Sequence, residues 1–187
     1  SRRQRQMCIR DSYNRFPMAR TQILNANQIE RKLQRIARQI AEEFFTAPSL
    51  HLVSIAGNGE VMGHRLALIL NDICDMPIHE STIHLNKLNP LSEDITCDID
   101  LNRFKKQHVV LVDDVLNSGK TLIYGASHLL SSGPKRISTA VMIDRIHRQF
   151  PIRADFCGLS LSTNLKENIV IEIQSTPSNQ DSANLMD

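Results

Sequence analysis

The sequence predicts an α/β protein whose central sheet is mainly parallel and is flanked by helices. Three runs of apolar and β-branched residues, at 50–56, 108–112 and 136–143, have the composition of buried strands. Segments with helical periodicity separate these runs, and strands that alternate with helices form parallel sheets. The length of 187 residues fits one domain. In such sheets ligands bind at the carboxyl ends of the strands.

The first half of the chain supplies one helix, one strand, a second helix and a second strand. Apolar residues at 29, 33, 36, 40 and 44 recur at steps of three or four, which predicts a helix. "LHLVSIA" (50–56) is the first strand, "GNGE" ends it, and helical periodicity resumes over 61–69. "PIHESTIHL" (77–85) has alternating character and predicts a strand. Residues 87–106 are polar and irregular, which is typical of a mobile lid.

The second half continues the alternation. "HVVLVDD" (108–114) is a strongly apolar strand that ends in two acids, and a helix is expected from Gly119 onward. "RISTAVMI" (136–143) is the next strand, and "ADFCG" and "NIVIEI" supply two short late ones.

The two ends of the chain differ from this pattern. Residues 1–12 hold four arginines and one aspartate, so they contribute +3 to the net charge of +2, and the remainder carries about −1. They lack the apolar segment of a signal peptide, and we interpret 1–20 as a disordered or artefactual leader. Residues 175–187 are polar and predict a disordered tail, which leaves 21–174 as the folded domain.

Composition excludes several classes of protein. No apolar run approaches the roughly 20 residues that cross a bilayer. The four cysteines form no C-x-x-C pair and the seven histidines show no metal-binding spacing, so neither a disulfide framework nor a protein-held metal site is expected. Cysteines used in this way indicate buried thiols in a reducing cytoplasm.

The stretch "HVVLVDDVLNSGKTL" (108–122) carries the chemistry. Its Ser-Gly-Lys-Thr ending resembles a nucleotide-triphosphate loop, but that motif needs glycine where this chain has Asp114. A strand instead delivers two carboxylates ahead of a turn that leads into a helix. Backbone amides, hydroxyls and the helix dipole at such a turn favour one phosphate, and Gly119 allows close approach. Adjacent carboxylates suit the neighbouring hydroxyls of a ribose, so the pattern predicts a ribose 5-phosphate site.

The same stretch resembles the phosphoribosyl-pyrophosphate (PRPP) signature of the type I phosphoribosyltransferases, and the resemblance extends over about 23–173. "DR-x-HR-x-x-PIRAD" (144–155) is similar to the bacterial pyrimidine-operon attenuators that double as uracil phosphoribosyltransferases. The resemblance implies the type I fold with a small hood region, a homo-oligomer, and transfer of ribose 5-phosphate to a pyrimidine-like base, with uracil giving UMP and pyrophosphate.

The resemblance also assigns roles to residues by position. Asp113 and Asp114 would bind the ribose hydroxyls, and Lys87 would act from the lid. The remaining PRPP-binding residues would be Val115, Leu116, Asn117, Ser118, Gly119, Lys120 and Thr121. The pyrophosphate loop would comprise Ala56, Gly57, Asn58 and Gly59. The base would lie near Ile143, Asp144, Arg145, Phe156 and Cys157, with Phe156 either stacked on the ring or part of the core.

In this reaction a base nitrogen attacks C1 of the ribose as pyrophosphate leaves, so no protein nucleophile is required. Mg²⁺ would be bound mainly through PRPP and water. Two departures from the family pattern oppose full activity: the pyrophosphate loop lacks a lysine or arginine, and the lid has Lys87 where an arginine is usual. The alternative is therefore a PRPP or nucleotide sensor, or an RNA-binding regulator, with little turnover. Basic residues within 135–153 are the candidate RNA patch.

Overall fold

The computed structural model describes residues 20–162 and 167–186, and it confirms the predicted α/β class. A six-stranded sheet has the order β4-β3-β2-β5-β6-β7, and a three-stranded sheet has the order β1-β9-β8. All pairs in the large sheet are parallel except β3 with β4. The expected leader at 1–20 lies outside the described residues, apart from Arg20, which begins β1.

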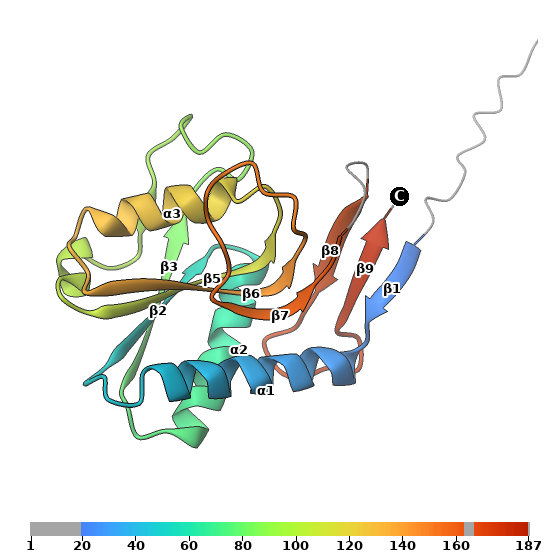
Figure 1. Cartoon of the computed structure of the whole chain (residues 1–187), viewed down its shortest axis with the longest axis horizontal. Coiled ribbons are helices and arrows are strands. Elements are labelled where there is room, and N and C mark those ends of the chain that lie inside the picture. The colour runs from blue at the N-terminus through green and yellow to red at the C-terminus, as the bar shows by residue number, and fades with distance from the viewer. Residues whose placement is uncertain (1–19, 163–166, 187) are drawn as a thin grey trace, which may run out of the picture.

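The strands of the large sheet are β2 (Leu50–Ile55), β3 (Ile78–His84), β4 (Thr96–Cys97), β5 (His108–Leu116), β6 (Arg136–Asp144) and β7 (Phe156–Ser160). The small sheet, here called the hood, consists of β1 (Arg20–Leu24), β8 (Asn168–Glu172) and β9 (Ser182–Met186). Figure 1 shows the hood beside β7, at one end of the large sheet.

Helices cover both faces of the large sheet (Figure 1). α1 (Ala26–Glu43) and α2 (Asn58–Ile73) pack on one face, and α3 (Lys120–Leu130) packs on the other. Alternation along β5 explains the two layers, because Val110 and Val112 face α1 and α2 while Val109 and Leu111 face α3. None of the described helices is both long and apolar enough to span a membrane.

Side-chain hydrogen bonds fix the N-terminus of α1. The side chain of Asn25 accepts a hydrogen bond from the Gln28 amide, and the Gln28 side chain accepts one from the Asn25 amide, both at 2.9 Å. This reciprocal pair is a capping box. It starts a helix whose buried residues Ile29, Leu33, Ile36 and Ile40 match the predicted face.

Regular secondary structure forms in two segments that were expected to be irregular or disordered. Residues 87–106 contain β4 and a 3₁₀ helix at Leu101–Phe104, which is anchored by the fully buried Phe104. Within the expected tail at 175–187, β9 pairs with both β1 and β8 and forms the middle strand of the hood. Both faces of β9 are covered, because the consecutive residues Ala183 and Asn184 point to opposite faces and are each at most 3% exposed.

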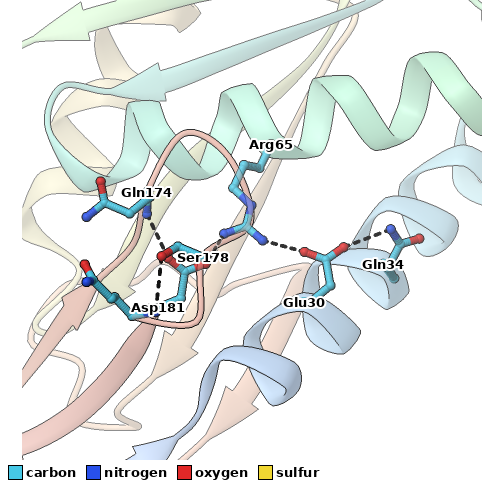
Figure 2. Close-up of polar contacts among 7 residues, drawn as sticks. Glu30, Gln34, Arg65, Gln174, Ser178 and Asp181 are labelled. Atoms are coloured by element: carbon cyan, nitrogen blue, oxygen red, sulfur yellow. Dashed lines mark hydrogen bonds and ion pairs between the residues drawn. The ribbon is translucent and has the colours of Figure 1, made fainter.

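A buried ion pair holds this C-terminal segment on the body of the protein (Figure 2). The guanidinium of Arg65, on α2, donates to the carboxylates of Glu30, on α1, and Asp181, just before β9. Asp181 also accepts a hydrogen bond from the backbone amide of Gln174 at 3.0 Å. Because Asp181 lies between β8 and β9, the arginine joins the hood to both helices on one face of the sheet.

Candidate active site

A cavity of about 430 Å³ opens at the carboxyl end of β5, where the sequence places its ribose 5-phosphate site. It lies between the start of the lid, the turn that follows β5, and the hood. The lining residues are Lys87, Leu88, Asp113, Asp114, Val115, Leu116, Asn117, Ser118, Gly119, Lys120, Thr121, Leu122 and Ile169. Lys87 therefore lines the same cavity as all nine residues that were predicted to bind PRPP.

The two acids belong to the strand itself, which continues to Leu116, rather than to a turn after it. Asp113 is only 3% exposed, and its Oδ1 accepts hydrogen bonds from Lys87 Nζ at 3.1 Å and from the Asp114 amide at 3.0 Å. Burial, followed by the neighbouring charge of Asp114, raises the pKa of Asp113 to about 7, and Lys87 opposes that rise. Asp113 thus reaches the cavity from within the protein and is poised to change charge near neutral pH.

Asp114 is half-buried and is held from the other side. Its Oδ2 accepts a hydrogen bond from Asn58 Nδ2 at 3.1 Å. The same amide nitrogen donates to the carbonyl of Ile171 in the hood at 2.8 Å. A single carboxamide therefore connects the start of α2, the second acid and β8.

The turn after β5 has the geometry of an anion cradle. Gly119 has φ of +86°, a conformation that side chains other than glycine rarely adopt, and it precedes the first residue of α3. A Cβ on Gly119 would lie 2.7 Å from Ile152 Cγ2. The carbonyl of Ser118 accepts hydrogen bonds from the amides of Gln149 and Phe150, at 2.9 and 3.0 Å, so the turn rests on the 145–152 segment. The Lys120 amide donates to Ser118 Oγ at 3.3 Å, and the N-terminus of α3 offers further backbone amides to a phosphate.

The lid begins in contact with this cradle. Lys120 Nζ donates to the carbonyl of Leu88 at 3.2 Å, while Lys87 pairs with Asp113. Leu88 is 88% exposed although it lines the cavity. Two lysines, one on each side, therefore hold the first residues of the lid over the site.

The predicted pyrophosphate loop is beside the acids without lining this cavity. Gly57 adopts φ of +94° and precedes α2, which begins at Asn58, three residues before the predicted start. A Cβ on Gly59 would be 3.1 Å from Asp113 Oδ1, so glycine at 59 allows the loop to approach the buried acid. The amide of Ala56 donates to the carbonyl of Ile83, so Ala56 extends the pairing of β2 with β3.

The residues predicted to bind the base are divided between the site and the core. Arg145 donates to Asn117 Oδ1 at 2.7 Å and supports the phosphate turn. Asp144 is buried and accepts hydrogen bonds from Arg148 and from the Ile146 amide. Ile143 is fully buried in the core. None of the three lines the cavity.

Phe156 was expected either to stack on the base or to belong to the core, and the structure places it in the core. Phe156 is 7% exposed, lies in the core cluster with α1, and contacts the Phe44 ring at a centroid distance of 6.4 Å. As the first residue of β7 it points toward the helices, so its ring is not available to a base in the cavity. The backbone carbonyl of Cys157, expected to help read the base edge, accepts a hydrogen bond from Arg35 at 2.8 Å.

Sequence reasoning missed three residues that line the cavity. Leu88 and Leu122 flank predicted site residues, and an extension of each motif by one position would have found them. Ile169 comes from β8, more than 45 residues after the phosphate turn, and no motif marks it. Among the residues described, no group of three histidine, cysteine or acidic side chains is arranged to hold a metal ion.

Comparison with known proteins agrees with this geometry. A model of the phosphoribosyl transferase domain matches residues 19–176. "Bifunctional protein PyrR" of Leuconostoc mesenteroides is 34% identical over 163 residues, which cover 84% of this chain and 93% of that protein. The protein of the same name from Caldicellulosiruptor bescii is 37% identical over 156 residues, covering 78% of this chain and 84% of its own.

Solved structures share the fold at lower identity. A hypoxanthine-guanine phosphoribosyltransferase from Bacillus anthracis aligns with a TM-score of 0.65 at 19% identity, over 82% of this chain and 87% of that one. The hypoxanthine phosphoribosyltransferase of Trypanosoma cruzi aligns with a TM-score of 0.66 at 20% identity, over 75% and 81%. The chain belongs to the phosphoribosyltransferase family and, by its sequence relatives, groups with the bifunctional PyrR proteins.

Proposed function

We propose that this phosphoribosyltransferase transfers ribose 5-phosphate from PRPP to a pyrimidine base, with uracil as the acceptor and UMP and pyrophosphate as the products. The observation that carries the proposal is the position of Asp113 and Asp114 in one cavity with the Ser118–Thr121 turn. Two carboxylates beside an amide-lined turn match a sugar diol beside its phosphate monoester. The resemblance of 144–155 to uracil-specific relatives supports the choice of base.

The residues of the site act by positioning and electrostatics. The turn and the N-terminus of α3 hold the 5-phosphate, which fixes the sugar. Asp113 and Asp114 accept hydrogen bonds from the ribose hydroxyls, and their negative charge stabilises the positive charge that develops at C1 as the bond to pyrophosphate breaks. Lys87, at the start of the lid, pairs with Asp113 and stabilises charge on the leaving group.

Mg²⁺ fits these residues as a partner of the substrate. Adjacent carboxylates and substrate oxygens are the ligands that Mg²⁺ prefers, and two acids at one edge leave its other positions to PRPP and water. When bound, the ion neutralises charge on the pyrophosphate leaving group. Asp114 is the better placed of the two acids, because Asp113 is buried and already paired with Lys87.

A base-panel assay tests the proposal directly. Purified full-length chain with Mg²⁺, PRPP and each of uracil, cytosine, hypoxanthine and guanine should release pyrophosphate with uracil. Asp113→Asn/Asp114→Asn should reduce that release by at least about a hundredfold, because the stabilising charges are removed. Asp72→Asn, an exposed acid on α2, is the matched control. Unchanged turnover in the double variant contradicts the assigned roles.

The second candidate function is a sensor that binds PRPP or UMP with little turnover, or that uses them to regulate RNA binding. It is favoured by the pyrophosphate loop, where Asn58 contacts Asp114 and Ile171 in place of a cation for the leaving group. Calorimetry separates the two functions. PRPP or UMP binding without pyrophosphate release from any base supports the sensor, and absence of both PRPP and UMP binding contradicts both functions.

Three further proposals follow from the family resemblance. We expect the chain to act in the cytoplasm and to form a homo-oligomer, which light scattering of the purified protein tests. RNA binding is expected to be weak at moderate salt, because the chain without residues 1–12 carries nearly no net charge. A filter-binding titration with and without UMP measures it.

A further inference from the structure

A second cavity, of about 460 Å³, lies at the amino ends of the strands of the central sheet, opposite the end that holds the PRPP site. Its polar residues come from the beginnings of β2 and β3, from the residues just before β2 and β5, and from the 3₁₀ helix. We call it the histidine cavity, defined by Ser49, His51, His79, Glu80, Arg103 and Gln107. Its volume falls within the roughly 300–1,000 Å³ of small-molecule sites.

Two histidines form one wall of this cavity. His51 and His79 are paired in register on β2 and β3, and their ring centroids are 4.8 Å apart. The Phe104 ring packs edge-on against His51 at 5.3 Å. His51 is 8% exposed, and its Nδ1 makes no hydrogen bond to any described residue. A buried polar nitrogen without a partner is costly and uncommon, and a ligand or water in the cavity is the usual explanation.

The other polar groups of the cavity are mostly unused donors. Arg103 is exposed and has no carboxylate partner within 20–162 or 167–186. Gln107 accepts a hydrogen bond from Ser49 Oγ at 3.2 Å through its carbonyl oxygen, which leaves its amide nitrogen free to donate. Glu80 is the one acid, and His64, on α2, engages its carboxylate at 3.1 Å.

The electrostatics agree with this set of donors. Burial and, after it, the positive charges of His79 and Arg103 together lower the pKa of His51 to about 4. The environment of His51 is therefore cationic as well as poorly solvated. An anion in the cavity would relieve both conditions, since it supplies a hydrogen-bond acceptor and a negative charge.

We propose that the histidine cavity binds a small phosphate-bearing anion, with the Arg103 guanidinium as its main contact and His51, His79 and the Gln107 amide as further donors. Arg103 offers a planar fork that matches phosphate oxygens. A tetrahedral phosphate has more acceptor oxygens than a carboxylate and so satisfies more of these donors at once. The site is independent of the PRPP cavity, which is formed at the carboxyl end of β5.

Side-chain NMR of the two histidines tests the proposal on the full chain. Inorganic phosphate should shift the assigned imidazole resonances of His51 and His79 saturably, and should move the titration midpoint of His51 upward. Arg103→Gln should weaken this binding by roughly tenfold or more, because a charge-assisted hydrogen bond is lost. Glu80→Gln should strengthen it several-fold, because the one opposing charge is removed.

The controls separate this cavity from other phosphate sites. The proposed function expects phosphate to bind the turn after β5 as well, but the cavity at that turn shares no residue with the histidine cavity. Lys105→Gln removes an exposed charge two residues from Arg103 and should leave the binding unchanged. Absence of a saturable shift overturns the proposal, as do equal shifts with acetate or equal affinities in Arg103→Gln and the unmodified chain.

Discussion

The side-chain amide of Asn58 donates to Oδ2 of Asp114 at 3.1 Å and to the carbonyl of Ile171 at 2.8 Å. Asn58 occupies the loop in which the family usually has a cation. Its observed contacts show that the position holds Asp114, an acid of the candidate site, and ties it to the hood. Asn58, which stands in the loop that lacks the family's usual cation, therefore has a positioning role.

Asn58→Ala should raise the KM for PRPP by about ten- to a hundredfold at every pH, since Asp114 loses a charge-assisted hydrogen bond. Asn58→Asp should raise the KM further, because repulsion between two carboxylates replaces the hydrogen bond to Asp114. Steady-state pyrophosphate release at varied PRPP concentration measures both effects. Equal KM values for the two variants would contradict a direct contact.

The raised pKa of Asp113 predicts that the free energy of unfolding decreases as pH rises. Its pKa of about 7 in the folded chain lies above the ordinary value of 3.8, so the folded state retains a proton that the unfolded state has lost. The free energy of unfolding should fall between pH 5 and pH 8, by on the order of 2 kcal/mol from this group. Asp113→Asn, which cannot titrate, should lack this part of the decrease in urea unfolding. A decrease as large as in the unmodified chain would refute the assignment.

Lys87 should set the pH at which activity appears. Its ammonium lies 3.1 Å from Asp113 and lowers the pKa of that acid. Lys87→Met should move the acid limb of the kcat/KM profile to higher pH, whereas Lys87→Arg should retain its position. Lys105→Met, on the exposed surface, serves as the control. If the acid limb of the Lys87→Met profile is not shifted, the ion pair between Lys87 and Asp113 does not form in solution.

The Arg65 ion pairs should dominate the stability of the hood. Arg65→Met leaves the Asp181 carboxylate, 1% exposed, buried without its cation. Loss of one member of a buried pair costs about 3–5 kcal/mol. Urea unfolding should show that loss, and Arg65→Met/Asp181→Asn should recover part of it. A single variant within about 1 kcal/mol of the unmodified chain is inconsistent with a buried pair.

Two glycines with positive φ provide a matched test of the phosphate turn. Gly119→Ala should abolish measurable PRPP binding, because the new Cβ meets Ile152 at 2.7 Å in addition to backbone strain. Gly133→Ala has similar strain at φ of +69° but open space around it, far from the cavity. It should cost about 1 kcal/mol of stability and leave PRPP affinity unchanged. Equal effects on affinity would remove the special role of Gly119.

Local sequence was sufficient to predict those features whose pattern lies within a single helix, strand or turn. The period of α1, the apolar run of β5 and the adjacent Asp113 and Asp114 predicted both the fold class and the position of the cavity. These features are short-range, because side-chain periodicity and turn chemistry act within a few residues. The nine residues that the family resemblance assigned to PRPP binding are consecutive, 113–121, and all line the cavity.

Contacts between distant segments were decided only by the tertiary structure. The polar segment before the C-terminus becomes the central strand of the hood because Arg65 neutralises Asp181 and because β1 and β8 supply its hydrogen bonds. Phe156 joins the core rather than the base site because the pleat of β7 turns it toward Phe44. Asn58 meets Asp114 across 56 residues of chain. Periodicity and motifs describe neighbours along the chain, whereas the burial and pairing of these groups depend on neighbours in space.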